Sequence, residues 1–233
     1  MNTTIPSGLR HLDMIRQACL ITERTSNSIL HGYAPDLRVL GTSLSALYQA
    51  ATCHRKCYGG PHILEALSGR AYNLACAAYR LAVQGFYDEA MNLVRSIGEI
   101  SNLIALSVVD KEALCQWLSA DPDTRKKKFS PVKVREMLAQ SGGFPIHADR
   151  DWYTNLCEKY THVHPGTRPN LHNAAGQAYV GGQFQADGLK TVLDELASVL
   201  CMTAMLVCQY VKLDDLYEEL VQQIRAQDKS SET

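Results

Sequence analysis

The sequence predicts an all-α fold, a bundle of about seven to nine helices. Apolar residues recur three and four positions apart through most of the chain, which is the spacing of one helix face. The 233 residues are 46% apolar and 20% charged, enough apolar material for a sizeable core. Glycine, proline and helix-capping residues separate the periodic runs and divide the chain into elements.

The first predicted helix begins after Ser7, a capping residue, and runs to about Leu30 before Gly32 ends it. Its apolar stripe contains Leu9, Leu12, Ile15 and Cys19. Asp36 is expected to cap a second helix that continues to Cys57. The apolar side of that helix contains Leu37, Leu40, Leu44, Leu47 and Ala51. Because Gly59-Gly60-Pro61 breaks the chain, we expect 1–62 to be an N-terminal helical pair packed on a bundle formed by 63–233.

A third helix is expected over 63–84, with Gly85 as its C-terminal cap. The fourth, 87–109, is the most amphipathic. Its apolar face contains Leu93, Ile97, Ile100 and Ile104, and its polar stripe contains Asp88, Asn92, Arg95, Glu99 and Asn102. That stripe is either a solvent face or a polar seam facing a cleft. Ser and Asn, in place of the Lys and Glu usual on a wet surface, favour the seam.

Residues 110–120 are expected to form a short helix, and 121–128 a polar, basic connection. Ser130-Pro131 opens a further helix, whose inward side contains Val134, Met137 and Leu138. The one basic cluster contains Lys126, Lys127, Lys128, Lys133 and Arg135. A solvated surface is the favoured interpretation of this cluster, and a binding site is the alternative.

The next helix, about 148–163, stops before Pro165, which cannot continue the hydrogen-bond ladder. One of its faces contains Tyr153, Cys157, Tyr160 and His164, and the helix end also gathers His162 and Arg168. The Gly- and Asn-rich stretch 165–188 follows, with a small hairpin expected around Gly181-Gly182.

The apolar run 187–211 predicts a core helix rather than a membrane span, because it includes Lys190, Asp194 and Glu195. The last helix is amphipathic and contains Leu213, Leu216, Leu220 and Ile224. Leucines exposed at this spacing seek a partner surface, which predicts a homodimer.

The net charge of −1 and pI of about 6.7 indicate no strong nucleic-acid or membrane-surface field, so any nucleic-acid contact requires a local patch. None of the eight cysteines forms a C-x-x-C pair, which favours a reduced, cytoplasmic protein without disulfides. The N-terminus shows no secretory signal pattern.

The candidate site joins the fourth helix to the helix before Pro165. Arg95 and Glu99 lie one turn apart, as do Tyr160 and His164, and buried charges need partners. Catalysis would use His164 or Glu99 as the base, Arg95 as the cation and Tyr160 as a positioned phenol. Lys159, His162, Arg168 and Asn92 are the candidate binding residues. The alternative is a buried network that fixes helix register.

Metal binding is the less favoured option, and no metal or cofactor is predicted. The imidazoles of His162, His164, His147 and His172 are near in sequence. However, residues two apart on a helix point to different faces, and no H-E-x-x-H motif is present.

Three segments resemble an uncharacterised family of bacterial helical proteins with an Arg-Ser-x-x-Glu helix and a later Tyr-His-Pro-like element. They are 85–100, the Trp117 segment and Tyr160-Thr-His-Val-His-Pro165. The layout is similar to HEPN domains, many of which are dimeric, metal-independent ribonucleases or toxins. The HEPN signature is an arginine, four to six residues and a histidine. Here the residue five before His164 is Lys159, so Lys159 or Arg95 would contact phosphate.

The resemblance implies a HEPN-like bacterial protein that binds or cleaves RNA or nucleotides in defence or stress. The alternative is a non-catalytic helical interaction or structural module. No membrane association is expected.

Overall fold

The computed structural model describes residues 7–57, 60–141, 147–163 and 165–231. The described chain is all-helical, which confirms the predicted helical bundle. The helices are α1 (Leu9–Ile29), a 3₁₀ turn (Leu30–Tyr33), α2 (Ala34–Ala51), α3 (Ile63–Val83), α4 (Tyr87–Val109), α5 (Ala113–Ser119), α6 (Pro122–Lys128), α7 (Pro131–Gln140), α8 (Arg150–Leu156), a π-helical turn (Cys157–Thr161), α9 (Ala186–Val211) and α10 (Asp214–Ser231).

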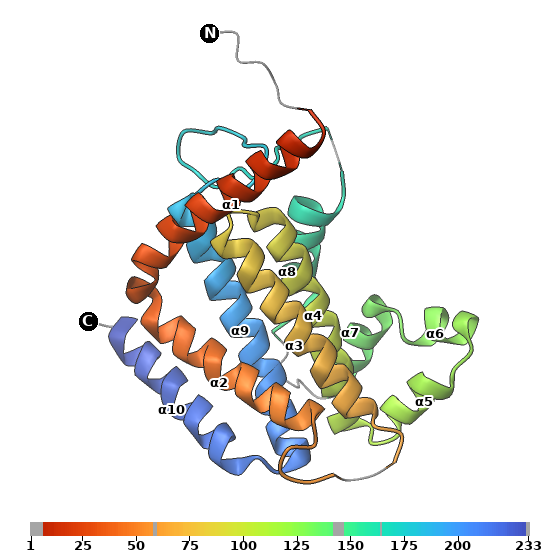
Figure 1. The fold of residues 1–233 in the computed structure, drawn as a ribbon. Helices are drawn as coiled ribbons and strands as arrows, with labels where there is room; N and C mark the ends of the chain where they lie inside the picture. The colour runs from red at the N-terminus through yellow and green to blue at the C-terminus, as the bar shows by residue number, and fades with distance from the viewer. Residues whose placement is uncertain (1–6, 58–59, 142–146, 164, 232–233) are drawn as a thin grey trace, which may run out of the picture.

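Helices α2, α3, α4 and α9 pack side by side and enclose the core, with α10 on the outside of α2 and α9 (Figure 1). The largest buried side chains include Leu47, Ile97, Leu193 and Leu200. Helix α9 is the described helix that is long and apolar enough to cross a membrane. Since 67% of its most apolar window is buried inside the bundle, it is the core helix that the sequence predicts.

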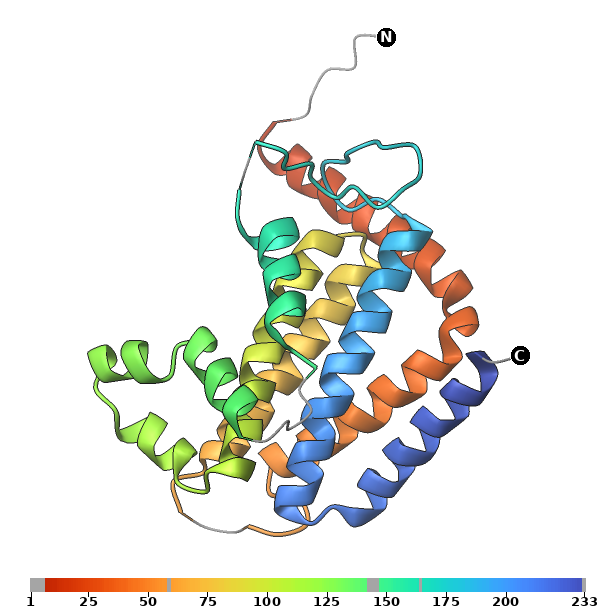
Figure 2. The same ribbon diagram turned by 180° about the vertical axis from the view of Figure 1, so that it is seen from behind.

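Seen from behind, α8 lies along α4, while α5, α6 and α7 form an arm at one side (Figure 2). Gly85 ends α3 with a φ of 82°, the left-handed conformation that glycine adopts without strain, as predicted. Most of the predicted connection 121–128 forms helix α6 (Pro122–Lys128). The Asp121 side chain accepts hydrogen bonds from the backbone N–H groups of Asp123 and Thr124, and Pro122 starts the helix.

Helix α1 differs from prediction at both its cap and its stripe. Its N-cap is Gly8, without a side-chain cap bond, so Ser7 does not cap it. Leu9, Leu12 and Ile15 are 80%, 62% and 42% exposed, so they do not join the core. The spacing of apolar residues shows that a helix has an apolar and a polar face. Which part of the helix is buried depends on the elements that pack against it.

Three further expectations are wrong. They concern the cap of α2, the hairpin in the 165–185 segment and the exposed leucines of α10. Helix α2 begins at Ala34, so Asp36 lies in its first turn and is not the cap. The expected hairpin around Gly181-Gly182 is irregular chain. Leu213, Leu216 and Leu220 are buried in the chain's own core, which removes the exposed-leucine argument for a homodimer.

Candidate functional site

The polar stripe of α4 is a seam, as the second interpretation of its pattern has it, but it faces packed protein where that interpretation expected a cleft. Asp88, Asn92, Arg95 and Glu99 are half-buried, and Asn102 is buried. The side chains contact residues from 148 to 172 that pack along α4. For example, the Asn102 amide donates a 2.7 Å hydrogen bond to the backbone oxygen of Ala148. The seam is therefore covered rather than facing solvent.

Arg95 and Glu99 pair with Tyr153 and Cys157. The Arg95 guanidinium donates to the Tyr153 hydroxyl and, over 3.0 Å, to the Cys157 sulfur. It also forms a 2.9 Å ion pair with Glu99. The Tyr153 hydroxyl in turn donates to Glu99 over 2.7 Å. The predicted contact between α4 and the helix of 148–163 is confirmed, but the predicted partner Tyr160 is wrong.

Arg135 of α7 completes this group. Its guanidinium carbon lies 4.0 Å from the centre of the Tyr153 ring, and that of Arg95 lies 4.4 Å from it. Arg135 is only 8% exposed, so it does not belong to the surface cluster in which the sequence analysis placed it. We call Arg95, Glu99, Arg135, Tyr153 and Cys157 the Tyr153 cluster. Burial, together with the hydrogen bond to Glu99, raises the pKa of Tyr153 to about 12.

The Tyr153 cluster contains two guanidinium groups and one carboxylate, and that carboxylate, Glu99, pairs with Arg95. The Nη1 atom of Arg135 is buried and has no hydrogen-bond partner among the described residues. Buried charged donors are normally paired, so an unpaired one marks a place where an anion would be stabilised.

Tyr160 is turned away from the cluster by the π-helical turn. In a regular α-helix Tyr153, Cys157 and Tyr160 would share a face. The wider turn, closed by the bond from the His162 N–H to the Cys157 oxygen at 2.9 Å, changes the direction of the residues after it. The Tyr160 ring instead stacks on the His172 ring, with 6.0 Å between the two centroids. Burial raises the pKa of Tyr160.

A second polar group ties the 165–185 segment to the start of α4. His172 lies 2.9 Å from the Asp88 carboxylate. Asn170 donates from its backbone N–H to Asp88, and its side chain bonds the backbone N–H of Tyr87 and the oxygen of Gly85. Asn170 has a φ of 50°, which asparagine tolerates better than most residues. A hydrogen-bonded network therefore replaces the expected hairpin.

The remaining predicted site residues do not converge. Asn92 donates to the Tyr160 backbone oxygen and accepts from the Thr161 hydroxyl, so it fixes the π-helical turn. Lys159, His162 and Arg168 are exposed. His164 lies outside the described residues.

Two of the histidines considered as metal ligands, His147 and His172, lie in different parts of the structure and have different partners. His172 pairs with Asp88, whereas His147 lies 3.6 Å from Glu195 of α9. That imidazole and the Trp152 indole, which donates to the same carboxylate, lower the pKa of Glu195. In the described chain, the group of side chains close enough together to hold a metal ion is Cys53, Cys57 and His62.

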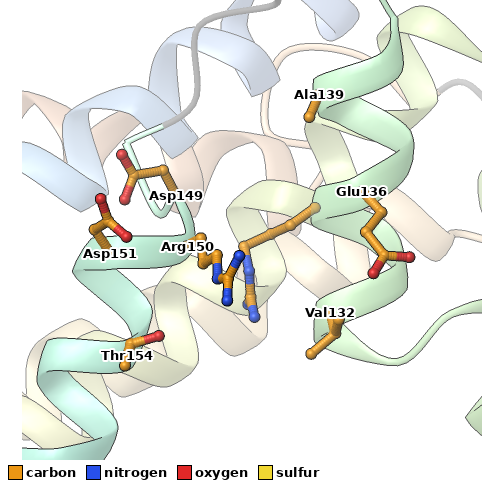
Figure 3. Close-up of a pocket in the computed structure, with 8 residues that line it drawn as sticks. Val132, Glu136, Ala139, Asp149, Arg150, Asp151 and Thr154 are labelled. Atoms are coloured by element: carbon orange, nitrogen blue, oxygen red, sulfur yellow. The ribbon is translucent and has the colours of Figure 1, made fainter.

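A cavity of about 670 Å³ lies between α7 and α8, beside the Tyr153 cluster. Its lining residues are Val132, Arg135, Glu136, Ala139, Asp149, Arg150, Asp151 and Thr154. Figure 3 shows the Arg150 side chain extending into the space between the two helices, with Asp149 and Asp151 on the α8 side and Glu136 on the α7 side. Sequence reasoning missed this cavity, because the partner of α7 could not be known from periodicity.

Neither the known protein-family models, nor the curated proteins, nor the solved structures contain a match to this chain. The similarity to HEPN domains therefore depends on the sequence motifs alone.

Proposed function

We propose that this chain is a HEPN-like protein that binds RNA or a nucleotide, with the phosphate of the ligand in the cavity between α7 and α8. The observation that carries this proposal is the pair of arginines that line the cavity, Arg135 and Arg150, of which Arg135 has one guanidinium nitrogen, Nη1, without a hydrogen-bond partner among the described residues. Arginine is the side chain best suited to phosphate, because its planar fork can donate two parallel hydrogen bonds.

The rest of the lining fits a ligand that also carries hydrogen-bond donors. Glu136, Asp149 and Asp151 are acceptors at the same cavity, and carboxylates accept from the amino groups of bases. The volume is within the usual range for a small-molecule site. Helix α6, which contacts α7, contains the exposed Lys126 and Lys127 and adds positive charge to the same arm of the molecule.

Binding is tested by fluorescence anisotropy with a labelled single-stranded RNA and by calorimetry with ATP, at low salt. Arg150→Ala removes an exposed cation of the cavity and should weaken binding roughly tenfold, the usual effect of one charge-assisted hydrogen bond. Arg225→Ala, an exposed arginine on α10, is the matched control and should change nothing. Wild-type protein that binds neither probe, or equal binding by both variants, contradicts the proposal.

Cleavage of the bound RNA without a metal ion is a separate activity from binding. It is tested by incubating RNA with the protein in the presence of EDTA. The closed pairing of Arg95 and Glu99 supports a structural role for these two residues. Cleavage would therefore have to depend on His164 and Tyr160. Loss of cleavage in a folded His164→Ala variant supports catalysis, and an inactive wild-type protein excludes it.

The second candidate is a non-catalytic interaction module. The observation that favours it is the exposed apolar row of α1, which contains Leu9, Leu12 and Ile15. A second copy of the chain is the proposed occupant. Light scattering should then show a dimer that Leu12→Gln dissociates, whereas a monomeric wild-type protein would contradict this candidate.

A further inference from the structure

The connection between α2 and α3 brings Cys53, Cys57 and His62 together. One nitrogen or sulfur atom from each lies within 4.8 Å of those of the other two. In chain order they form Cys-x₃-Cys-x₄-His, followed three residues later by Glu65. A pair of cysteines two to four residues apart with a nearby histidine is the ligand spacing typical of zinc sites. The chain has no C-x-x-C pair, but Cys53 and Cys57 are separated by one residue more than in that motif.

Glu65 lies beside the group and contacts two of its members, although its carboxylate is not within 4.8 Å of all three ligand atoms. Its Oε1 atom is 3.8 Å from the Cys53 sulfur and 3.2 Å from the Nδ1 atom of His62. Around a tetrahedral zinc ion with ordinary bond lengths, neighbouring sulfur–oxygen and nitrogen–oxygen pairs are about 3.6 and 3.4 Å apart. The two observed separations differ from these values by only a few tenths of an ångström. To complete the set, the carboxylate would have to keep these two separations and move towards the remaining ligand atom.

The backbone at two of these residues is unusual. Cys53 has a φ of 51° and His62 a φ of 48°, values that favour glycine. The other described non-glycine residues with positive φ are Asn170, in the network at α4, and Lys212, the C-cap of α9. Strained conformations persist where the surroundings impose them, and here they occur at two neighbouring candidate ligands.

Other contacts hold this connection in place. Arg55, between the two cysteines, forms hydrogen bonds of 2.6 and 2.8 Å with Asp215 of α10 and one of 2.6 Å with Gln49 of α2. Partial burial and the neighbouring Cys57 and Glu65 raise the pKa of the Cys53 thiol. A bound cation would reverse that effect, because it stabilises the thiolate.

We propose that this chain binds one Zn²⁺ ion through the sulfur atoms of Cys53 and Cys57 and a ring nitrogen of His62, and that the carboxylate of Glu65 moves in as the fourth ligand. Two thiolates with an imidazole in a tetrahedral arrangement favour zinc over harder ions. Four protein ligands leave no open position, so the site is structural and fixes the α2–α3 connection. Binding releases the two thiol protons, and the affinity should therefore increase with pH.

The test uses the full chain without an affinity tag, reduced and stripped of metal. Titration with zinc against a chromogenic chelator should give one ion per chain. Cobalt substitution should give the intense visible bands of a tetrahedral site and the near-ultraviolet band of a thiolate ligand. Cys57→Ser should weaken zinc binding by at least about 100-fold, and Glu65→Gln by roughly tenfold or more.

Cys19→Ser is the matched control, because Cys19 is a half-buried thiol outside the group, and it should keep wild-type affinity. Circular dichroism of the metal-free variants shows that each is folded. Equal zinc affinity of wild type and a folded Cys53→Ser/Cys57→Ser variant would overturn the proposal. So would a Cys53–Cys57 disulfide, found by mass spectrometry, in freshly purified protein that contains no zinc. None of these measurements depends on RNA or nucleotide binding.

Discussion

The hydroxyl of Tyr153 donates a 2.7 Å hydrogen bond to the carboxylate of Glu99, across the interface between α8 and α4. The same carboxylate pairs with Arg95, and a second guanidinium, that of Arg135, lies over the Tyr153 ring. Glu99 is therefore the one anion in a group with two cations. This arrangement predicts that the α4–α8 interface is sensitive to the loss of the negative charge of Glu99.

Glu99→Gln should destabilise the protein by about 1–3 kcal/mol, because it keeps the shape but removes the charge that compensates Arg95 and Arg135. Urea unfolding followed by circular dichroism measures the free energy of unfolding. Glu89→Gln, an exposed glutamate on the same helix, should stay within about 0.5 kcal/mol of wild type. Equal effects of the two substitutions would show that the Tyr153 cluster contributes nothing.

Tyr153→Phe keeps the ring but removes the hydroxyl, and should cost about 2 kcal/mol at pH 7. The pKa of Tyr153 is raised from 10.0 to about 12 in the folded state. Its stabilising contribution is therefore complete below pH 10 and is lost as the pH rises towards 12. The difference in unfolding free energy between wild type and variant should shrink over that range. A difference that is constant up to pH 12 contradicts the proposed pairing of the neutral hydroxyl.

Gly98 and Gly41 are both inside helices but should respond oppositely to alanine. A Cβ atom at Gly98 would lie 2.6 Å from the Trp152 ring, whereas one at Gly41 meets nothing within 4 Å. Gly98→Ala should destabilise by about 1–3 kcal/mol through overpacking. Gly41→Ala should stabilise by about 0.5–1 kcal/mol through helix propensity. The melting temperatures of the two variants, measured by thermal unfolding, compare these effects. A Gly98→Ala variant more stable than wild type would mean that Trp152 of α8 does not pack on Gly98 of α4.

Asn170→Ala removes the side-chain bonds to Tyr87 and Gly85 and places alanine at a positive φ. We expect a loss of about 3 kcal/mol, of which Asn170→Gly should recover about 1 kcal/mol because glycine tolerates that backbone. Hydrogen exchange of 170–185 should accelerate in both variants. The control is Asn155→Ala, an exposed position on α8, and exchange as slow in Asn170→Ala as in this control would contradict the network.

The sequence by itself determined most of the helices, α6 being an exception, and it showed that α4 has one apolar and one polar face. Helix periodicity and caps such as Gly85 are local properties, written within a few consecutive residues. The same pattern correctly indicated that Asn92, Arg95 and Glu99 face other protein rather than solvent, because a seam selects different polar residues from a wet surface.

Only the tertiary structure decided which residues meet across that seam. One residue of a helix advances it by about 1.5 Å and turns it by about 100°, so a single π-helical turn moved Tyr160 to His172 and left Tyr153 and Cys157 opposite Arg95. The burial of Arg135 and the meeting of Cys53, Cys57 and His62 depend in the same way on how separate segments pack. Such contacts join groups that local spacing leaves independent, and their geometry exists only once the helices are assembled.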